Sequence, residues 1–356
     1  MGSWDRISPL SEGCALDYKR DHSIFNIKTV GHHFIPLVLC GMVLALGTQS
    51  CDKNASPGGP FAVQPPTPAN YELEWGNPGT GNGQFNGPDG IAVNSAGTSV
   101  YVVDSFNDRV EVFDGSGKYL TQWGAPGTGN GQFFEPVGIA VNSSGTTVYV
   151  TDAYSERVEA FSGSGTYLAQ WSTAGYGPGQ FSWPDGIAIN SAGTTLYVTD
   201  SNYNQVDVFN GSGLYLSQWG SRGNGNGQFS APGPGNIAVN SGGTTVYVSD
   251  PQGNRIEAFS GSGAYLTQWG TYGNGNGQFY GPGDIAVNSA GTTVFVEDVD
   301  NDRVETFNGS GTYLTQWGTY GYPAGFFRTP LFIALDGMGN QYITDYSNNR
   351  VEKFAP

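Results

Sequence analysis

The sequence has little cysteine and histidine, and all of it lies near the N-terminus. The six residues are Cys14, Cys40, Cys51, His22, His32 and His33. Residues 52–356 therefore cannot form a disulfide, a zinc–thiolate site or a cysteine nucleophile, and they offer no imidazole as a general base. Enzyme classes that depend on these groups are excluded for this part of the chain.

Positive charge is also scarce. The chain has 14 Lys and Arg against 30 Asp and Glu, a formal net charge of −16 at pH 7. Residues 1–70 hold five basic and five acidic side chains, whereas residues 71–356 hold nine and 25. Nucleic acid is bound through clustered Lys and Arg, so it is excluded as a partner, and cationic partners or metal ions are favoured.

Abundant glycine and aromatic residues indicate short strands joined by tight turns. The chain contains 56 Gly, 20 Pro, 20 Tyr, 20 Phe and 8 Trp. This composition predicts an all-β protein with little room for helices.

One uncharged apolar run, FIPLVLCGMVLAL, spans residues 34–46. As a helix it would be roughly 20 Å long, short of the roughly 30 Å of a bilayer core, so it indicates the h-region of a signal peptide. The segment resembles a bacterial lipoprotein signal: Ser50-Cys51 matches, whereas Thr48 departs from the usual aliphatic residue. We expect residues 1–51 to be a targeting segment with a lipid on Cys51. Plain secretion or an unprocessed buried helix are the alternatives.

Residues 52–70 are Pro-rich and lack hydrophobic periodicity, which predicts a linker. The protein is thus expected to be exported to the cell envelope, lipid-anchored or secreted, and to touch a membrane only through its N-terminal segment.

From residue 71 the chain repeats six times. The repeats are marked by Trp75, Trp123, Trp171, Trp219, Trp269 and Trp317, and by the Phe of a GQF-type motif at Phe85, Phe133, Phe181, Phe229, Phe279 and Phe327. The spacing is 48 residues except for one of 50. Each repeat contains four strand-length apolar runs separated by turn signals, which is typical of a propeller blade.

Residues 71–356 are therefore predicted to form a six-bladed β-propeller of four-stranded antiparallel blades. The strand-like segment 71–75 precedes the first full repeat, and the last repeat stops after its third strand. We expect strand 71–75 to complete the last blade and close the ring, because both sheet edges would otherwise stay exposed.

The motif "FNGPDGIAVN…VYVVDSFNDRVEVF" resembles the NHL repeat, and the resemblance covers residues 71–356. It implies a six-bladed propeller that is usually a binding platform and occasionally an enzyme. Two positions depart from the pattern: Gln205 replaces the usual Arg in the third repeat, and Leu331-Phe332 replaces the Pro-Asp-Gly turn in the sixth.

An Asp ends the second strand of every repeat, and in five repeats an Arg follows five residues later. The residues are Asp104, Asp152, Asp200, Asp250, Asp298 and Asp345, with Arg109, Arg157, Arg255, Arg303 and Arg350. Because they recur in every blade, we predict a structural role, with the carboxylate capping turn N–H groups and pairing with the Arg.

Functional residues are expected where the repeats differ on one face. The loops that contain GQF and the loops between second and third strands emerge on the same side, which we call the loop face. Its variable aromatic residues are Phe106, Phe134, Tyr154, Tyr176, Trp183, Tyr203, Tyr272, Tyr280, Tyr320 and Tyr322, with acidic Asp108, Glu135, Glu156, Asp300 and Asp302 among them. Exposed aromatic rings among carboxylates suit a carbohydrate or a basic peptide.

The candidate ligand-binding residues on this face are Phe106, Phe134, Tyr154, Trp183, Tyr203 and Tyr280. The alternative is that these rings only cover glycine-rich backbone between blades.

A second candidate lies at the mouth of the central channel, just before the first strands. Asp89, Asp185, Asn236 and Asp284 are placed to converge on a hard cation such as Ca²⁺. The alternative is that they are ordinary turn residues.

The expected function is a monomeric, non-enzymatic module that binds a protein or carbohydrate partner through its loop face. The alternative is a calcium-dependent, lactonase-like hydrolase, and a mainly structural spacer is a third possibility.

Overall fold

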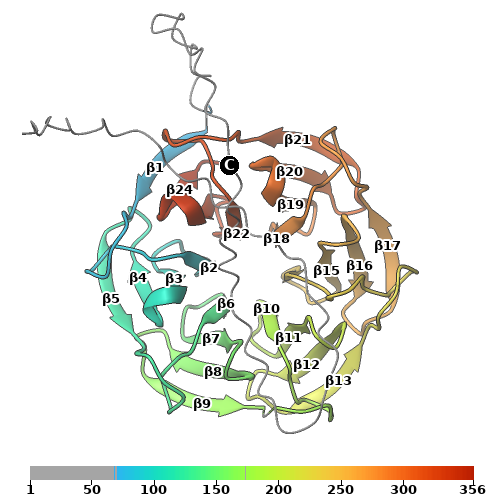
Figure 1. Ribbon diagram of the computed structural model, residues 1–356, viewed down its shortest axis with the longest axis horizontal. Helices are drawn as coiled ribbons and strands as arrows, with labels where there is room; N and C mark the ends of the chain where they lie inside the picture. The colour runs from blue at the N-terminus through green and yellow to red at the C-terminus, as the bar shows by residue number, and fades with distance from the viewer. Residues whose placement is uncertain (1–67, 69, 173) are drawn as a thin grey trace, which may run out of the picture. The chain divides into compact units, whose positions relative to one another are not determined.

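The computed structural model describes residues 68, 70–172 and 174–356, so the signal segment, Cys51 and most of the linker lie outside the described residues. Six four-stranded antiparallel sheets form a ring of blades around a central channel (Figure 1). This arrangement confirms the predicted six-bladed propeller.

The blades are numbered in chain order, and each runs from an inner to an outer strand. Blade one contains β2 (Pro88–Val93), β3 (Val100–Asp104), β4 (Arg109–Phe113) and β5 (Tyr119–Trp123). Blade two contains β6 (Pro136–Val141), β7 (Thr147–Asp152), β8 (Arg157–Ser162) and β9 (Tyr167–Trp171). Blade three contains β10 (Pro184–Ile189), β11 (Thr195–Asp200), β12 (Gln205–Asn210) and β13 (Tyr215–Trp219).

Blade four contains β14 (Ile237–Val239), β15 (Thr245–Asp250), β16 (Arg255–Ser260) and β17 (Tyr265–Trp269). Blade five contains β18 (Pro282–Val287), β19 (Thr293–Asp298), β20 (Arg303–Asn308) and β21 (Tyr313–Trp317). Blade six contains β22 (Pro330–Leu335), β23 (Gln341–Asp345), β24 (Arg350–Phe354) and β1 (Tyr71–Trp75). The helices of the described residues are the short 3-10 turns η1 (Ser105–Asn107), η2 (Val299–Asn301) and η3 (Tyr346–Asn348).

Strand β1 closes the ring by pairing antiparallel with β24, with Tyr71 opposite Phe354 and Trp75 opposite Val351. The Ala355 N–H donates to the Asn70 carbonyl over 2.7 Å just beyond the strand. Two ion pairs, Lys353–Glu72 and Arg350–Glu74, each 2.7 Å long, join the same two chain segments. The N-terminal strand therefore completes the last blade, as the sequence predicts.

The hydrophobic core lies between neighbouring blades. Phe85 is fully buried and packs on Phe113, with ring centroids 5.6 Å apart. The five equivalent GQF phenylalanines are also fully buried. Gly76 permits this contact, because its φ of +103° lies in the region that favours glycine and a Cβ there would be 2.5 Å from the Phe85 ring. The phenylalanine of the glycine-rich motif is thus buried between blades.

In five of the six blades a buried Asp–Arg pair joins the hairpin to the GQF loop beside it. In blade one, the Asp104 carboxylate accepts from the Asn86 N–H over 2.6 Å and from Arg109 Nε over 2.7 Å. The Arg109 guanidinium also donates to loop carbonyls of Thr80, Gly81 and Gln84. These bonds confirm that the Asp carboxylate caps a loop N–H group and pairs with the Arg.

No helix of the described residues is long and apolar enough to cross a membrane.

Candidate functional site

The loop face is built from two sets of loops that are held together by hydrogen bonds. Asn107 in η1 donates to the Gly79 carbonyl over 3.0 Å, and Arg109 donates to Thr80 O over 2.8 Å. Asn301 and Asn348 make the equivalent bonds to Gly273 and Gly321. The side chains on these two loops therefore share one face of the propeller.

Aromatic rings meet in pairs on this face. The pairs are Phe106–Tyr346, Phe134–Tyr154, Tyr176–Tyr203 and Tyr272–Tyr280, with ring centroids 6.4, 4.4, 4.8 and 5.3 Å apart. In blade six the Arg328 guanidinium lies 4.6 Å from the Tyr322 ring centroid and 5.7 Å from that of Tyr320. We call these residues the aromatic crown. It has members from every blade except the fourth.

The crown is exposed to different degrees. Of the six candidates predicted from the sequence, Phe106, Phe134 and Tyr280 are exposed, whereas Tyr154, Tyr203 and Trp183, which is not part of the crown, are half-buried. Four further tyrosines extend more fully into solvent: Tyr176, Tyr272, Tyr320 and Tyr322, of which Tyr176 is 90% exposed. The assignment of a ligand to the six sequence candidates stays a prediction.

Some carboxylates of the loop face have structural partners. Asp108 Oδ1 accepts from the Glu135 N–H over 3.1 Å, and Asp302 Oδ1 accepts from the Thr329 N–H over 3.0 Å. Both bonds join one blade to the next, and Asn349 makes the same link to Gly87. Part of the predicted acidic surface thus ties neighbouring blades together.

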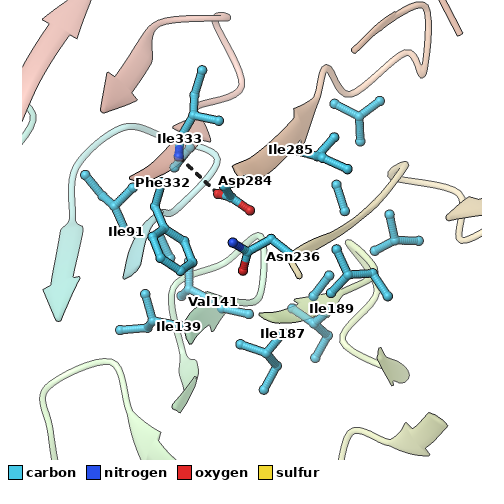
Figure 2. Close-up of a pocket in the computed structure, with 18 of the residues that line it drawn as sticks. Ile91, Ile139, Val141, Ile187, Ile189, Asn236, Asp284, Ile285, Phe332 and Ile333 are labelled. Atoms are coloured by element: carbon cyan, nitrogen blue, oxygen red, sulfur yellow. Dashed lines mark hydrogen bonds between the residues drawn. The ribbon is translucent and has the colours of Figure 1, made fainter. Parts of the chain in front are cut away.

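The channel mouth is a second place where the blades differ. A cavity of about 180 Å³ is lined by the first strands, and its walls are mostly Ile, Val and Ala side chains. Figure 2 shows Asn236, Asp284 and Phe332 gathered near its centre. Blades one to three have glycine at the corresponding positions, Gly90, Gly138 and Gly186. At this position blades four to six therefore place a side chain in the channel, and blades one to three do not.

Asp284 is buried, and its Oδ2 accepts from the Ile333 N–H over 3.0 Å (Figure 2). Burial raises the pKa of Asp284 to about 8, and the charges of Asp185 and Asp89 add to the rise. Asn236 Oδ1 is buried without a hydrogen-bond partner among the described residues. Asp89 and Asp185 do not line the cavity. The structure thus brings two of the four predicted channel residues into the cavity.

Glu297 in β19 is a feature that the sequence analysis missed. It is fully buried, and neither carboxylate oxygen has a hydrogen-bond partner in the described part of the chain. Burial raises the pKa of Glu297 well above its ordinary value, with the charges of Asp284 and Asp345 adding to it. Blades two, three and six have threonine at this position, and alignment of the six repeats would have shown the difference.

The hydroxyl groups of Thr151 and Thr199 at the equivalent position bridge two blades. Thr151 Oγ1 accepts from the Gly138 N–H and donates to the Asp185 carbonyl, each over 2.7 Å. Glu297 makes no such bridge among the described residues. At this position blade five therefore has a buried carboxyl group, whereas blade two has a hydroxyl group that makes hydrogen bonds.

The cavity is a poor fit for calcium. Ca²⁺ takes six to eight oxygen ligands, and the side chains lining the cavity offer oxygen atoms only from Asn236 and Asp284. Within residues 68, 70–172 and 174–356 no group of three or more His, Cys, Asp or Glu side chains is placed to hold a metal ion. A calcium site at the channel mouth stays a prediction.

Comparisons with known proteins agree with the fold. Residues 91–162 match a family model described as a 6-bladed beta-propeller. A search of curated proteins finds no match.

Several solved structures are similar. One is a structural genomics protein of unknown function from Bacteroides thetaiotaomicron VPI-5482, with TM-score 0.63 and 19% identity over 80% of this chain and 75% of that one. Streptogramin B lyase has TM-score 0.53 and 14% identity over 80% of this chain and 97% of that one. Hydrazine synthase of Kuenenia stuttgartiensis has TM-score 0.54 and 13% identity over 78% and 98%. At these identities the similarity shows the propeller fold alone.

Proposed function

We propose that the protein is an exported NHL-type propeller whose loop face binds a protein partner with basic side chains. The observation that carries this proposal is the aromatic crown, which presents exposed rings from five blades on one face. Aromatic residues contribute large contact areas at interfaces and attract cations over their ring faces.

The alternative, that the aromatic rings only cover glycine-rich backbone, explains the position of some crown residues but not of others. A Cβ on Gly87 would lie 2.9 Å from the Phe106 ring, so Phe106 covers that glycine closely. Tyr176, Tyr272 and Tyr322 are 90%, 67% and 56% exposed, and most of their ring area faces solvent. These tyrosines are therefore available to a partner.

The charge of the propeller favours a basic protein over a neutral glycan. Of the 25 acidic side chains of residues 71–356, sixteen are buried, and five of the nine basic ones are the buried arginines of the Asp–Arg pairs. Nine acidic and four basic side chains remain at least partly exposed, so the surface carries a net negative charge that attracts basic segments.

Peptide and glycan arrays probed with the full chain test the proposal. The array holds basic, neutral and acidic peptides beside a panel of glycans. One variant carries Tyr176→Ala, Tyr272→Ala and Tyr322→Ala. The control carries Leu120→Ala, Leu168→Ala and Leu266→Ala, which removes exposed apolar side chains from the outer strands.

We expect basic peptides to bind the full chain and the leucine control but to lose at least tenfold in affinity for the tyrosine variant. Binding to glycans alone, or binding that the tyrosine variant retains, would overturn the proposal.

A calcium-dependent hydrolase is the second candidate, favoured by the unpartnered Asn236 Oδ1 beside Asp284 in the channel. Lactone hydrolysis measured with and without a chelator tests it. The sparse oxygen lining makes it the weaker candidate.

A further inference from the structure

Five of the six blades hold a guanidinium in the same cage. In blade two, Arg157 Nε donates to Asp152 Oδ2 over 3.1 Å, and an Arg157 terminal nitrogen lies 3.1 Å from Glu159 Oε1. Further bonds run to the carbonyl oxygens of Thr128, Gly129 and Gln132. Both carboxylates are fully buried, so two buried acids share one buried cation.

Blade three builds this cage without the arginine. Asp200 and Asp207 occupy the two acid positions and are fully buried, but Gln205 stands where the other blades have Arg. Gln205 Nε2 donates to Asp207 Oδ2 over 2.9 Å, and Asp207 Oδ1 is buried without a hydrogen-bond partner among the described residues.

The amide is a weaker occupant than a guanidinium. A guanidinium offers five N–H donors and a positive charge, whereas a glutamine amide offers two donors and no charge. Asp200 adjusts by accepting from the Ser182, Trp183 and Tyr203 N–H groups at 2.8–3.3 Å. Asp207 Oδ1 has no hydrogen-bond partner among the described residues, as is true of one glutamate oxygen in blades two, four, five and six. The difference in blade three is therefore the missing positive charge between two buried acids.

The cage opens toward solvent beside the aromatic crown. Gln205 is half-buried, and the Gln218 Nε2 bond to Gln205 Oε1, 3.1 Å long, lies at the surface. In blade one the corresponding Arg109 and Gln122 line a surface hollow of about 400 Å³. The equivalent position in blade three therefore lies close to solvent.

Aromatic rings flank the entrance. Tyr176 occupies the position whose carbonyl accepts from arginine in the other blades, and its exposed ring lies 4.8 Å from that of Tyr203. Aromatic faces attract guanidinium groups, so the two rings suit the approach of an arginine side chain.

We propose that blade three binds the guanidinium of an arginine side chain from the protein partner, in the position that Arg157 occupies in blade two. The proposal rests on the proposed function and names the chemical group that the loop face recognises. The Gln205 amide moves aside, and the incoming guanidinium bonds to Asp207 and to the loop carbonyls. In the five internal copies an Asp, a Glu and loop carbonyls bind a guanidinium, and blade three has Asp207, which is one methylene shorter, in place of the Glu.

Titration of the full chain with N-acetyl-arginine amide tests the proposal, with the lysine and citrulline amides as matched probes. We expect one site for the arginine probe and at least tenfold weaker binding of the other two. Gln205→Arg restores the arginine of the other blades, so it is expected to fold and to reduce binding of the probe at least tenfold. Arg157→Gln empties a second cage and is expected to raise the stoichiometry from one to two.

The proposal is overturned if the full chain does not bind the arginine probe, if citrulline binds equally well, or if Gln205→Arg leaves binding unchanged. These results are distinguishable from failure of the proposed function. The small probe reports only on the cage, whereas the tyrosine variant on the peptide array reports on the crown.

Discussion

Gln205 Nε2 donates to Asp207 Oδ2 over 2.9 Å in blade three, at the place where Arg157 pairs with both acids of blade two. Blade three thus has a cluster of two buried acids without the cation that the other five blades hold. The other five blades show that this position normally holds an arginine, so the glutamine of blade three stands out as a specific change.

Replacement of Arg157 with glutamine should destabilise the fold by about 3 kcal/mol, because it leaves two buried carboxylates without their cation. Urea unfolding of the variant checks this. Replacement of the exposed Arg222 with glutamine is the control and should change the free energy of unfolding by less than about 0.5 kcal/mol. Equal effects of the two substitutions would contradict the buried pairing.

Stability should fall as pH rises from about 5 to 8. Burial raises the pKa of Glu159 and Glu305 to about 7 and that of Asp284 to about 8, all above their unfolded values. Between the unfolded and folded pKa values the unfolded chain loses these protons and the folded chain keeps them. Each such group therefore weakens folding by up to about 1.4 kcal/mol per pH unit in that window.

Glu297 provides the variant that isolates this effect. Glu297→Thr introduces the residue of blades two, three and six, whose hydroxyl bridges neighbouring strands. It should raise the free energy of unfolding, and by more at pH 8 than at pH 5. Thermal unfolding at both pH values measures this, and a lower stability of the variant at pH 8 would show that the carboxyl group is compensated in the native protein.

The fold could be predicted from the sequence because the same pattern of strands and turns occurs in each repeat. The Trp spacing, the GQF motif and the Asp-to-Arg hairpin each recur, so a local error in one copy is corrected by the others. The incomplete last repeat and the early strand 71–75 also predicted the closure that β1 and β24 make.

The candidate sites were less predictable, since they depend on which atoms are satisfied. Gln205 was visible as a departure from the pattern, but only the structure shows the unpartnered Asp207 Oδ1. The sequence places Glu297 in a strand but does not show that its carboxyl group is fully buried. Asp108 and Asp302 were predicted as surface acids, yet their bonds to the next blade depend on loop geometry that spacing does not give.

Loss of the closing strand should destabilise the whole ring. A chain that begins at residue 76 lacks the β1 ladder and both ion pairs, and it exposes the edge of β24. Compared with a chain that begins at residue 66, we expect a melting temperature lower by about 10 °C or more and self-association on size-exclusion chromatography. Equal melting temperatures would contradict the role of β1.

Thr329 has a φ of +61°, a region that β-branched residues rarely adopt, where Gly87 and Gly281 of other blades have φ of +70° and +66°. Thr329→Gly should therefore raise the free energy of unfolding by about 1 kcal/mol. Thr312→Gly is a suitable control, because that residue has no positive φ and should lose stability. A destabilised Thr329→Gly variant would show that the Thr329 side chain outweighs the backbone strain.

Site-specific photo-cross-linking can show whether the loop face binds a basic protein segment. A photoreactive phenylalanine analogue is placed in the full chain at Tyr272 or Tyr320 on the loop face, or at Leu120 or Leu266 on the outer strands. Binding at the loop face predicts cross-links to an arginine-containing peptide from the two tyrosine positions and none from the leucine positions. Cross-links from the leucine positions alone would contradict it.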